Sequence, residues 1–208
     1  MTREVHTDAA ADRHTGRDDE LLLRSRQDPT AFEPLVARHS AALHGYLVRR
    51  APDAADDLLS ELWLRAYAGR HGFDAARGTA RAWLFGVARH VLAAHWRRLE
   101  TEAPPGSARF AEGAEGMVSD PWQAVDRRLD AAAVSPVLRH ALAKLPAVER
   151  ELMLLIAWEQ LTPTEAASVV RIPPGTARSR LHRARTRLRK RLGALVPSTQ
   201  TSRTGESA

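Results

Sequence analysis

The stretch at residues 161–192, LTPTEAASVVRIPPGTARSRLHRARTRLRKRL, restricts the possible folds of this chain more than any other. Thr162 and Glu165 flank Pro163 in a capping box, in which the hydroxyl and the carboxylate each satisfy a free backbone amide. This pattern predicts a short helix from Pro163 to about residue 170, because the Pro-Pro pair that follows cannot continue it. The second of these prolines, Pro174, is well placed to begin another helix.

The second helix has two chemically different faces. Its apolar stripe at helical spacing comprises Ala177, Leu181, Ala184, Leu188 and Leu192. The opposite face carries Ser179, His182, Arg183 and Thr186. Two helices separated by a tight turn, with an apolar inner stripe and a cationic outer one, are typical of a helix-turn-helix with a recognition helix.

The charge of this segment favours a nucleic-acid partner. No acidic residue occurs between Glu165 and Glu206, whereas arginines recur throughout. A merely solvated helix face usually mixes signs to gain pairs between positions i and i+4, and this helix does not. We therefore expect it to bind DNA.

The segment resembles the promoter-binding end of the extracytoplasmic-function (ECF) sigma factors, which are bacterial RNA polymerase initiation factors. The residues that carry the resemblance are Leu145-Pro146, Arg150, Thr164 to Ala167, Ile172-Pro173 and the run GTARSRLHRAR at 175–185. Response-regulator output domains share the helix-turn-helix outline, so the N-terminal half must decide between them. The resemblance implies that this helix reads the minus-35 element through the major groove, with Arg178, Ser179, His182 and Arg183 near base edges. The candidate set also includes Thr176 and, as a contact to phosphate, Arg187.

Composition limits the remaining possibilities. A chain of 208 residues with 44% hydrophobic content can form one or two small domains, and a formal charge of +6 suggests a polyanionic partner. Because cysteine is absent, disulfides and thiolate metal sites are excluded. No apolar run approaches the ~18 residues that cross a bilayer, and the start lacks a signal-peptide core, so we expect a cytoplasmic protein.

The N-terminal half has a helical hydrophobic pattern from residue 18, after a lead-in at 1–17 that we expect to be disordered. Asp28-Pro29 precedes a helical stripe that comprises Phe32, Leu35, Val36, His39, Leu43, Tyr46 and Leu47. Asp53 is expected to cap the next helix, which ends near Tyr67. Residues 70–79 are expected to form a loop, and a long helix should follow from about Ala80 to Arg98.

This half resembles region 2 of the same sigma family, at Ala31-Phe32, Leu35, Asp57 to Leu64, Trp83-Leu84, Val87 to Arg89 and Arg97. The resemblance implies that Asp56, Asp57, Glu61 and Leu64 contact core polymerase. It also implies that the long helix and its preceding loop capture the minus-10 element as a single strand, with Phe73, Arg89, His90, Trp96, Arg97 and Arg98 as candidates. Ser60, His90 and Ala94 depart from the family pattern of glutamine, asparagine and aspartate.

The tryptophans allow two interpretations. Trp63, Trp83 and Trp96 can stack on unpaired bases or pack in a core. We favour the core for Trp63 and Trp83 and leave Trp96 undecided between the two.

The domain organisation follows from these segments. Residues 18–98 form a first domain, 99–119 an acidic Pro/Gly-rich linker, 120–192 a second domain, and 193–208 a disordered tail. The expected fold is all-α, with two small helical domains joined by a flexible linker. Helices are expected after Asp120-Pro121, with Trp122, Val125 and Leu129, and again at 148–158.

Other functions were weighed against a non-catalytic sigma factor. His39 with His44, and His90 with His95, are spaced i to i+5, which does not place two imidazoles on one helix face as a zinc protease requires. A metal-dependent hydrolase is therefore disfavoured, and no cofactor is expected. A dimeric helix-turn-helix regulator that needs no polymerase stays as the alternative. The partners expected are core RNA polymerase and promoter DNA, and an anti-sigma factor is left open as a third.

Overall fold

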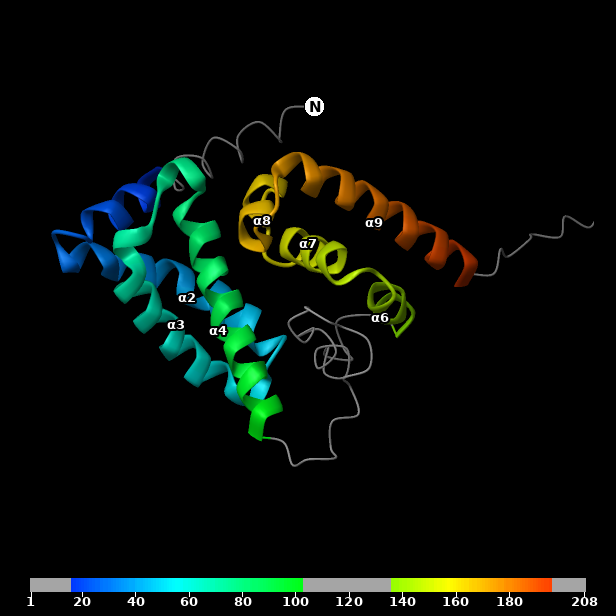
Figure 1. Cartoon of the computed structure of the whole chain (residues 1–208), viewed down its shortest axis with the longest axis horizontal. Helices are drawn as coiled ribbons and strands as arrows, with labels where there is room; N and C mark the ends of the chain where they lie inside the picture. Colours follow the sequence, from blue (N-terminus) through cyan, green and yellow to red (C-terminus); the bar gives the residue numbers. More distant parts are fainter. Residues whose placement is uncertain (1–15, 103–135, 196–208) are drawn as a thin grey trace, which may run out of the picture.

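A computed structural model describes residues 16–102 and 136–195 of the chain. Within these ranges every regular element is a helix or a short 3-10 turn, and the elements form two neighbouring groups (Figure 1). This arrangement confirms the predicted all-α class with two helical domains. None of the helices in the described ranges has the length and apolarity needed to cross a membrane.

The first domain comprises a helical segment at 16–24 and the helices α2 (Glu33–Val48), α3 (Ala55–Gly69) and α4 (Ala80–Glu102). The predicted stripe on α2 is confirmed, because Leu35, His39, Leu43, Tyr46 and Leu47 are buried. Asp28 does cap a turn, but that turn is the 3-10 element η1 (Pro29–Phe32), and the α-helix begins after it.

The expected cap at Asp53 is wrong. Pro52 begins a 3-10 turn, η2 (Pro52–Ala54), so that Asp53 lies inside this turn and not before a helix. Ala54 is the N-cap of α3 and makes no side-chain hydrogen bond there. The carboxylates Asp56 and Asp57 occupy the first turn of α3, where the positive end of the helix dipole stabilises them.

The expected loop at 70–79 contains two 3-10 turns, η3 (Arg70–Gly72) and η4 (Ala75–Arg77). Asp74 caps η4 through the amide of Ala76 at 3.0 Å. The start of α4 is fixed from two sides, because Asp19 accepts a hydrogen bond from the Ala80 amide at 2.5 Å and the Thr79 hydroxyl accepts one from Ala82 at 3.2 Å.

Three predicted boundaries are corrected. The linker was expected to begin at Leu99, but α4 continues to Glu102, since no helix breaker occurs before Pro104. Helical structure already begins at residue 16, inside the predicted lead-in, and α9 extends to Leu195, inside the predicted tail. The helix expected around Trp122, Val125 and Leu129 lies outside the described residues.

The second domain contains α6 (Pro136–Ala143), α7 (Ala147–Ala157), α8 (Pro163–Val170) and α9 (Pro174–Leu195). The predicted capping box is present: the Thr162 hydroxyl accepts from the Glu165 amide at 3.2 Å, and Glu165 accepts from the Thr162 amide at 2.9 Å. Helix α9 begins at Pro174 as predicted. The turn between α8 and α9 uses Arg171 in the left-handed conformation, with φ 58° and ψ 49°.

The two domains pack against each other and share one hydrophobic core. Buried residues from α2, α3 and α4 join Leu152, Leu155, Ala166 and Val169 of the second domain in a single cluster. In Figure 1 the α4 ribbon runs beside α8, and these two helices are in direct contact. We call this packing the closed arrangement.

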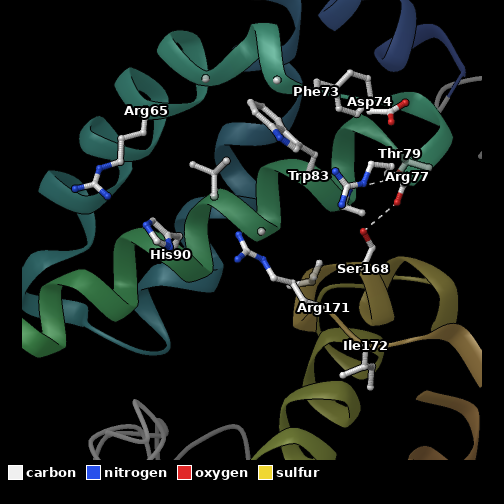
Figure 2. Close-up of a pocket in the computed structure, with 17 residues that line it drawn as sticks. Arg65, Phe73, Asp74, Arg77, Thr79, Trp83, His90, Ser168, Arg171 and Ile172 are labelled. Carbon is white, nitrogen blue, oxygen red and sulfur yellow. Dashed lines mark hydrogen bonds between the residues drawn. The ribbon is translucent and has the colours of Figure 1, made fainter. Parts of the chain in front are cut away.

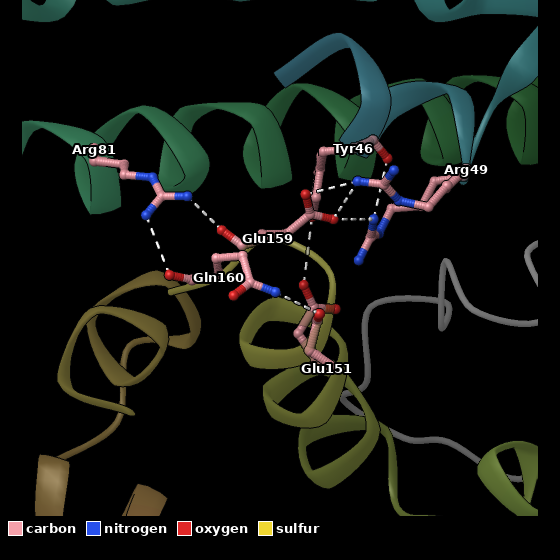
Figure 3. A network of polar contacts seen from close by, with 8 residues as sticks. Tyr46, Arg49, Arg81, Glu151, Glu159 and Gln160 are labelled. Atoms are coloured by element: carbon pink, nitrogen blue, oxygen red, sulfur yellow. Dashed lines mark hydrogen bonds and ion pairs between the residues drawn. The ribbon is translucent and has the colours of Figure 1, made fainter. Parts of the chain in front are cut away.

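A network of hydrogen bonds and ion pairs connects the two domains beside this core (Figure 3). Arg49 Nη2 lies 2.7 Å from both carboxylate oxygens of Glu159, and Arg50, which is 1% exposed, lies 3.6 Å from the same carboxylate. Arg81 donates to the backbone oxygens of Glu159 and Gln160. Because Glu159 is itself buried, this carboxylate depends on cations that the other domain supplies.

Candidate polymerase and nucleic-acid interfaces

Helix α9 presents the cationic face that its sequence predicts. Ala177, Leu181 and Ala184 are buried against the rest of the second domain, and α9 packs on α6, α7 and α8. The side chains of Arg178, Ser179, His182 and Arg183 are exposed, and Thr176 is half-buried. An exposed set of donors along the N-terminal part of a helix is the geometry of a recognition helix in a major groove.

Arg187 differs from the other arginines of this helix. Its Nη1 lies 2.5 Å from the carboxylate of Glu149, which is buried on α7. Arg187 therefore ties α9 to α7, and its role as a free phosphate contact, which the resemblance implies, competes with this ion pair. The sequence could not reveal this, because Arg187 and Arg183 have similar neighbours along the chain.

Helix α3 exposes an acidic face on the side away from the core. The Asp56 side chain is 95% exposed and lies 3.0 Å from His44, and Asp57 is exposed. Glu61 pairs with Arg65 at 2.6 Å, one turn further along. Leu64 is 73% exposed, which is the highest value among the exposed large hydrophobic residues of the described ranges. The structure thus brings all four predicted polymerase contacts to one helix.

The predicted minus-10 residues do not form a single open surface. His90, Arg97 and Arg98 are exposed on α4, and Arg97 donates back to the Ala93 carbonyl at 3.3 Å. Arg89 is half-exposed, but its Nε lies 4.0 Å from Glu151 of the other domain. In the closed arrangement, Arg89 therefore faces a carboxylate of α7.

The aromatic candidates are more buried than the basic ones. Phe73 is 3% exposed and meets Trp83 edge-on at 5.9 Å between ring centroids. Trp96 is half-buried, meets His95 at 5.2 Å and packs against the shared core. Trp63 and Trp83 also pack against that core, as favoured from the sequence. Stacking of Phe73 or Trp96 on a base requires a local rearrangement.

A hollow with a volume of about 900 Å³ lies between the loop at 70–79, α3, α4 and the end of α8 (Figure 2). Its lining includes Arg65, Arg77, Trp83, His90 and Arg171. The sequence did not single out Arg77 or Arg171 as members of a common site, because they belong to different domains.

The histidines do not form a metal site in the described ranges, where no group of three or more His, Cys, Asp or Glu residues is arranged to hold an ion. His39 is buried, and its Nε2 lies 2.8 Å from Asp18. Burial, together with the charges of Arg81 and Arg38, lowers the pKa of His39 to about 4. His39 thus serves as a neutral core residue.

Two protein-family models match the chain. The model described as "Sigma-70 region 2" covers residues 35–101, and the model described as "Sigma-70, region 4" covers residues 136–188. Each match lies within one of the two helical domains.

Curated relatives show the same family along most of the chain. The ECF RNA polymerase sigma factor SigL of Mycobacterium tuberculosis is 32% identical over 165 residues, which cover 77% of this chain and 88% of that protein. The ECF RNA polymerase sigma factor SigF of Caulobacter vibrioides is 30% identical over 176 residues, or 83% of this chain and 92% of that protein.

Two solved structures have a similar fold. The sigma factor RpoE in complex with the anti-sigma factor NepR from Bartonella quintana matches with a TM-score of 0.54 and 25% identity, over 78% of this chain and 96% of that one. CnrH in complex with the cytosolic domain of CnrY matches with a TM-score of 0.55 and 25% identity, over 86% of this chain and 98% of that one.

Proposed function

The chain belongs to the ECF sigma factors of the sigma-70 family, and we propose that it recruits core RNA polymerase through α3 and reads promoters through α4 and α9. As a member of this family it is a transcription initiation factor with no catalytic activity of its own. The observation that carries the residue-level proposal is the separation of an exposed acidic face on α3 from an exposed cationic face on α9. A dimeric DNA-binding regulator has no need of the first face.

The proposed polymerase contact consists of Asp56, Asp57, Glu61 and Leu64. Exposed carboxylates steer and orient a basic partner, and Leu64 offers an apolar group that gains stability when it is buried. All four remain accessible in the closed arrangement, so core polymerase can dock on α3 before the two domains separate.

The proposed minus-35 contact consists of Thr176, Arg178, Ser179, His182 and Arg183 on α9. Arg183 lies on the outward face, where a guanidinium can bond both acceptors of a guanine. We expect Arg183→Ala to cost about 1–3 kcal/mol of promoter binding and to relax the preference at one base pair. Holoenzyme binding to a panel of minus-35 variants measures both effects.

The proposed minus-10 contact centres on His90, Arg97 and Arg98, with Arg89, Phe73 and Trp96 joining after rearrangement. In the closed arrangement Arg89 faces Glu151, and Ser168 of α8 donates to the Arg77 carbonyl at 3.3 Å. The loop that precedes α4 is thereby in contact with the helix-turn-helix.

The closed arrangement cannot read both promoter elements at once. The centres of elements named for positions minus 35 and minus 10 lie roughly 25 base pairs apart, or about 85 Å at a rise of about 3.4 Å. Helices α4 and α9, with 23 and 22 residues, are about 35 Å and 33 Å long at about 1.5 Å per residue, so that even end to end they span less than this distance. We therefore propose that the two domains separate on the polymerase and that the free protein binds promoters poorly.

The location and the third partner follow from this proposal. A sigma factor works where core polymerase and the chromosome are, so we propose that the protein acts in the cytoplasm. One of the two similar solved structures is a sigma factor in complex with an anti-sigma factor, which supports a partner of that kind here.

The experiment that tests the proposal is a pull-down of core polymerase with the double variant Asp57→Arg/Glu61→Arg. Reversing the exposed charge of Asp57 and the half-buried charge of Glu61 on α3 should abolish binding and leave the circular dichroism unchanged. The double variant Glu20→Arg/Glu33→Arg, at exposed acidic residues outside this face, is the matched control and should bind as the wild type does. Retention of wild-type affinity in the Asp57/Glu61 variant would refute the proposed contact.

A further inference from the structure

The hollow between the two domains has the size of a small-molecule site. Its volume of about 900 Å³ falls within the usual ~300–1,000 Å³ of ligand pockets. The first domain contributes Trp83, Val87 and His90 of α4 to its lining, and the second domain contributes Ser168, Arg171 and Ile172. The site is therefore complete only in the closed arrangement.

The charged side chains around the hollow include two cations that make no ion pair. Arg65 pairs with Glu61, and the Asp74 carboxylate already caps η4. In the described part of the chain, no ion pair involves the guanidinium of Arg77 or of Arg171. Figure 2 shows Arg171 extending from the end of α8 toward α4. Two cations from different domains that line one hollow repel each other, and an anion between them would remove this repulsion.

Arg171 has a backbone conformation that glycine adopts with less strain. It ends α8 with φ 58° and ψ 49°, a left-handed C-cap in which glycine is the common and least strained choice. Residues other than glycine that are held in this region concentrate at ligand-binding and functional sites. The left-handed backbone closes the C-cap of α8, because the amides of Arg171 and Ile172 donate to the carbonyls of Ser168 and Ala167. The choice of arginine over glycine at this position is explained if the guanidinium has a ligand.

Gly86 is a second locally unfavourable residue on the same hollow. It lies inside α4, where glycine is less favourable than alanine, yet an added Cβ would meet nothing within 4 Å. Packing therefore does not require it. Gly86 follows Trp83 by three residues and precedes His90 by four, so all three share one helix face. Because Gly86 has no side chain, there is room for a planar group beside the indole of Trp83.

We propose that the hollow binds a free nucleoside phosphate, with the base over Gly86 against Trp83 and the phosphates between Arg77 and Arg171. The apolar lining from Trp83, Val87 and Ile172 suits a base, and guanidinium groups suit phosphate oxygens. Because the ligand contacts both domains, it holds the closed arrangement together. The promoter strand is not this ligand, since the two walls separate when the promoter elements are read.

The experiment is calorimetric titration of the full-length protein with ATP and with GTP at about 0.15 M salt. Arg171→Gly and Gly86→Ala each introduce the locally more favourable residue, so both should unfold at the same or a higher temperature. Both should nevertheless weaken nucleotide binding by roughly 10- to 100-fold, through a lost charge-assisted contact or a filled space. Arg171→Lys should recover part of the affinity. Arg189→Ala, on the exposed face of α9, should leave the affinity unchanged.

Additional ligands identify what the site recognises. Inorganic triphosphate that binds as tightly as ATP would overturn the role of the base. A single-stranded oligonucleotide is the other test ligand. If Arg171→Gly and Gly86→Ala weaken the binding of this oligonucleotide but not the binding of ATP or GTP, the hollow is a DNA site and the proposal is wrong. Nucleotide binding that both variants retain, or its absence in the wild type, would overturn the site itself.

The consequence for transcription rests on the proposed function. If the ligand stabilises the closed arrangement, ATP or GTP should slow promoter-complex formation by wild-type holoenzyme and leave Arg171→Gly holoenzyme unaffected. A protein that recruits polymerase but binds no nucleotide would refute this inference alone. A protein that binds nucleotide but never recruits polymerase would instead refute the proposed function.

Discussion

At the scale of single residues, arginines at different positions of helix α9 have different roles. Arg183 and Arg189 are exposed on α9, whereas Arg187 reaches the buried carboxylate of Glu149. A buried charge that loses its partner destabilises the fold, while an exposed cation that is lost near DNA weakens only the electrostatic attraction. The two kinds of arginine therefore differ in whether they pair with a buried carboxylate, and not in the arginine side chain itself.

This difference predicts opposite outcomes for two alanine variants. Arg187→Ala should lower the free energy of unfolding by about 1–3 kcal/mol, because Glu149 is left without this cation. Arg189→Ala should leave stability unchanged and reduce the slope of log affinity against log salt by about one unit. Urea unfolding and salt titrations of holoenzyme binding measure the two effects. Equal stability of both variants would contradict the structural role of Arg187.

His39 gives a residue-scale prediction about pH. Its pKa in the fold is about 4, below the ordinary ~6.5, so the stabilising neutral form is fully present above about pH 6.5. Stability is lost as the pH falls from about 6.5 toward 4, because the unfolded chain binds the proton more readily. We expect a loss of about 2 kcal/mol between pH 7.5 and pH 5, measured by urea unfolding.

The variant His39→Gln isolates this contribution. Its unfolding free energy should change less over the same pH range, since the amide does not titrate. His71→Gln, at an exposed imidazole, is the matched control and should follow the wild-type curve. An unchanged pH dependence in His39→Gln would assign the effect to other groups.

At the scale of elements, the sequence was sufficient to predict a helix end where a side chain forms a hydrogen bond with the backbone or where proline stops the helix. The capping box at Thr162 and Glu165 and the proline at 174 fixed the limits of α8 and the start of α9 in advance. The prediction that Asp53 caps a helix was wrong because Pro52 begins a 3-10 turn that includes Asp53. The left-handed residue Arg171 could not be predicted, since neither glycine nor asparagine marks the position.

The capping box allows an element-scale test. Thr162→Ala removes the hydroxyl that accepts from the Glu165 amide, and should lower the free energy of unfolding by about 0.5–2 kcal/mol. Thr164→Ala changes an exposed residue of the same turn that provides no cap, and should have little effect. Chemical denaturation of both variants makes the comparison, and equal losses would show that the cap contributes nothing particular.

At the scale of the whole molecule, the sequence predicted two domains and a linker but not their contact. The contact depends on pairs such as Arg49 with Glu159, which are 110 residues apart and show no periodic pattern. Arg50 resembles a surface arginine at a helix end, yet it is 1% exposed because the second domain covers it. Similarly, Arg89 could be named as a DNA contact, but its proximity to Glu151 depends on the packing of the domains.

The closed arrangement predicts that a covalent link between the domains will block promoter reading but not polymerase docking. A Cβ built on Gly78 lies 3.6 Å from Ser168 Cβ, within the ~3.5–4.5 Å that a disulfide spans, and the chain has no other cysteine. The variant Gly78→Cys/Ser168→Cys should therefore form a reversible clamp. Position 78 has φ 152°, so a cysteine there is strained, and both redox states carry the same substitutions.

The comparison between the two redox states of this variant therefore isolates the effect of the covalent link from that of the substitutions. Oxidised protein should still bind core polymerase through the exposed face of α3, while promoter-directed transcription falls at least about tenfold, because α4 and α9 cannot reach elements about 85 Å apart. Reductant should restore transcription. The single variants Gly78→Cys and Ser168→Cys should not respond to oxidant. If the oxidised double variant transcribes as well as the reduced one, the domains need not separate, and the closed arrangement is compatible with initiation.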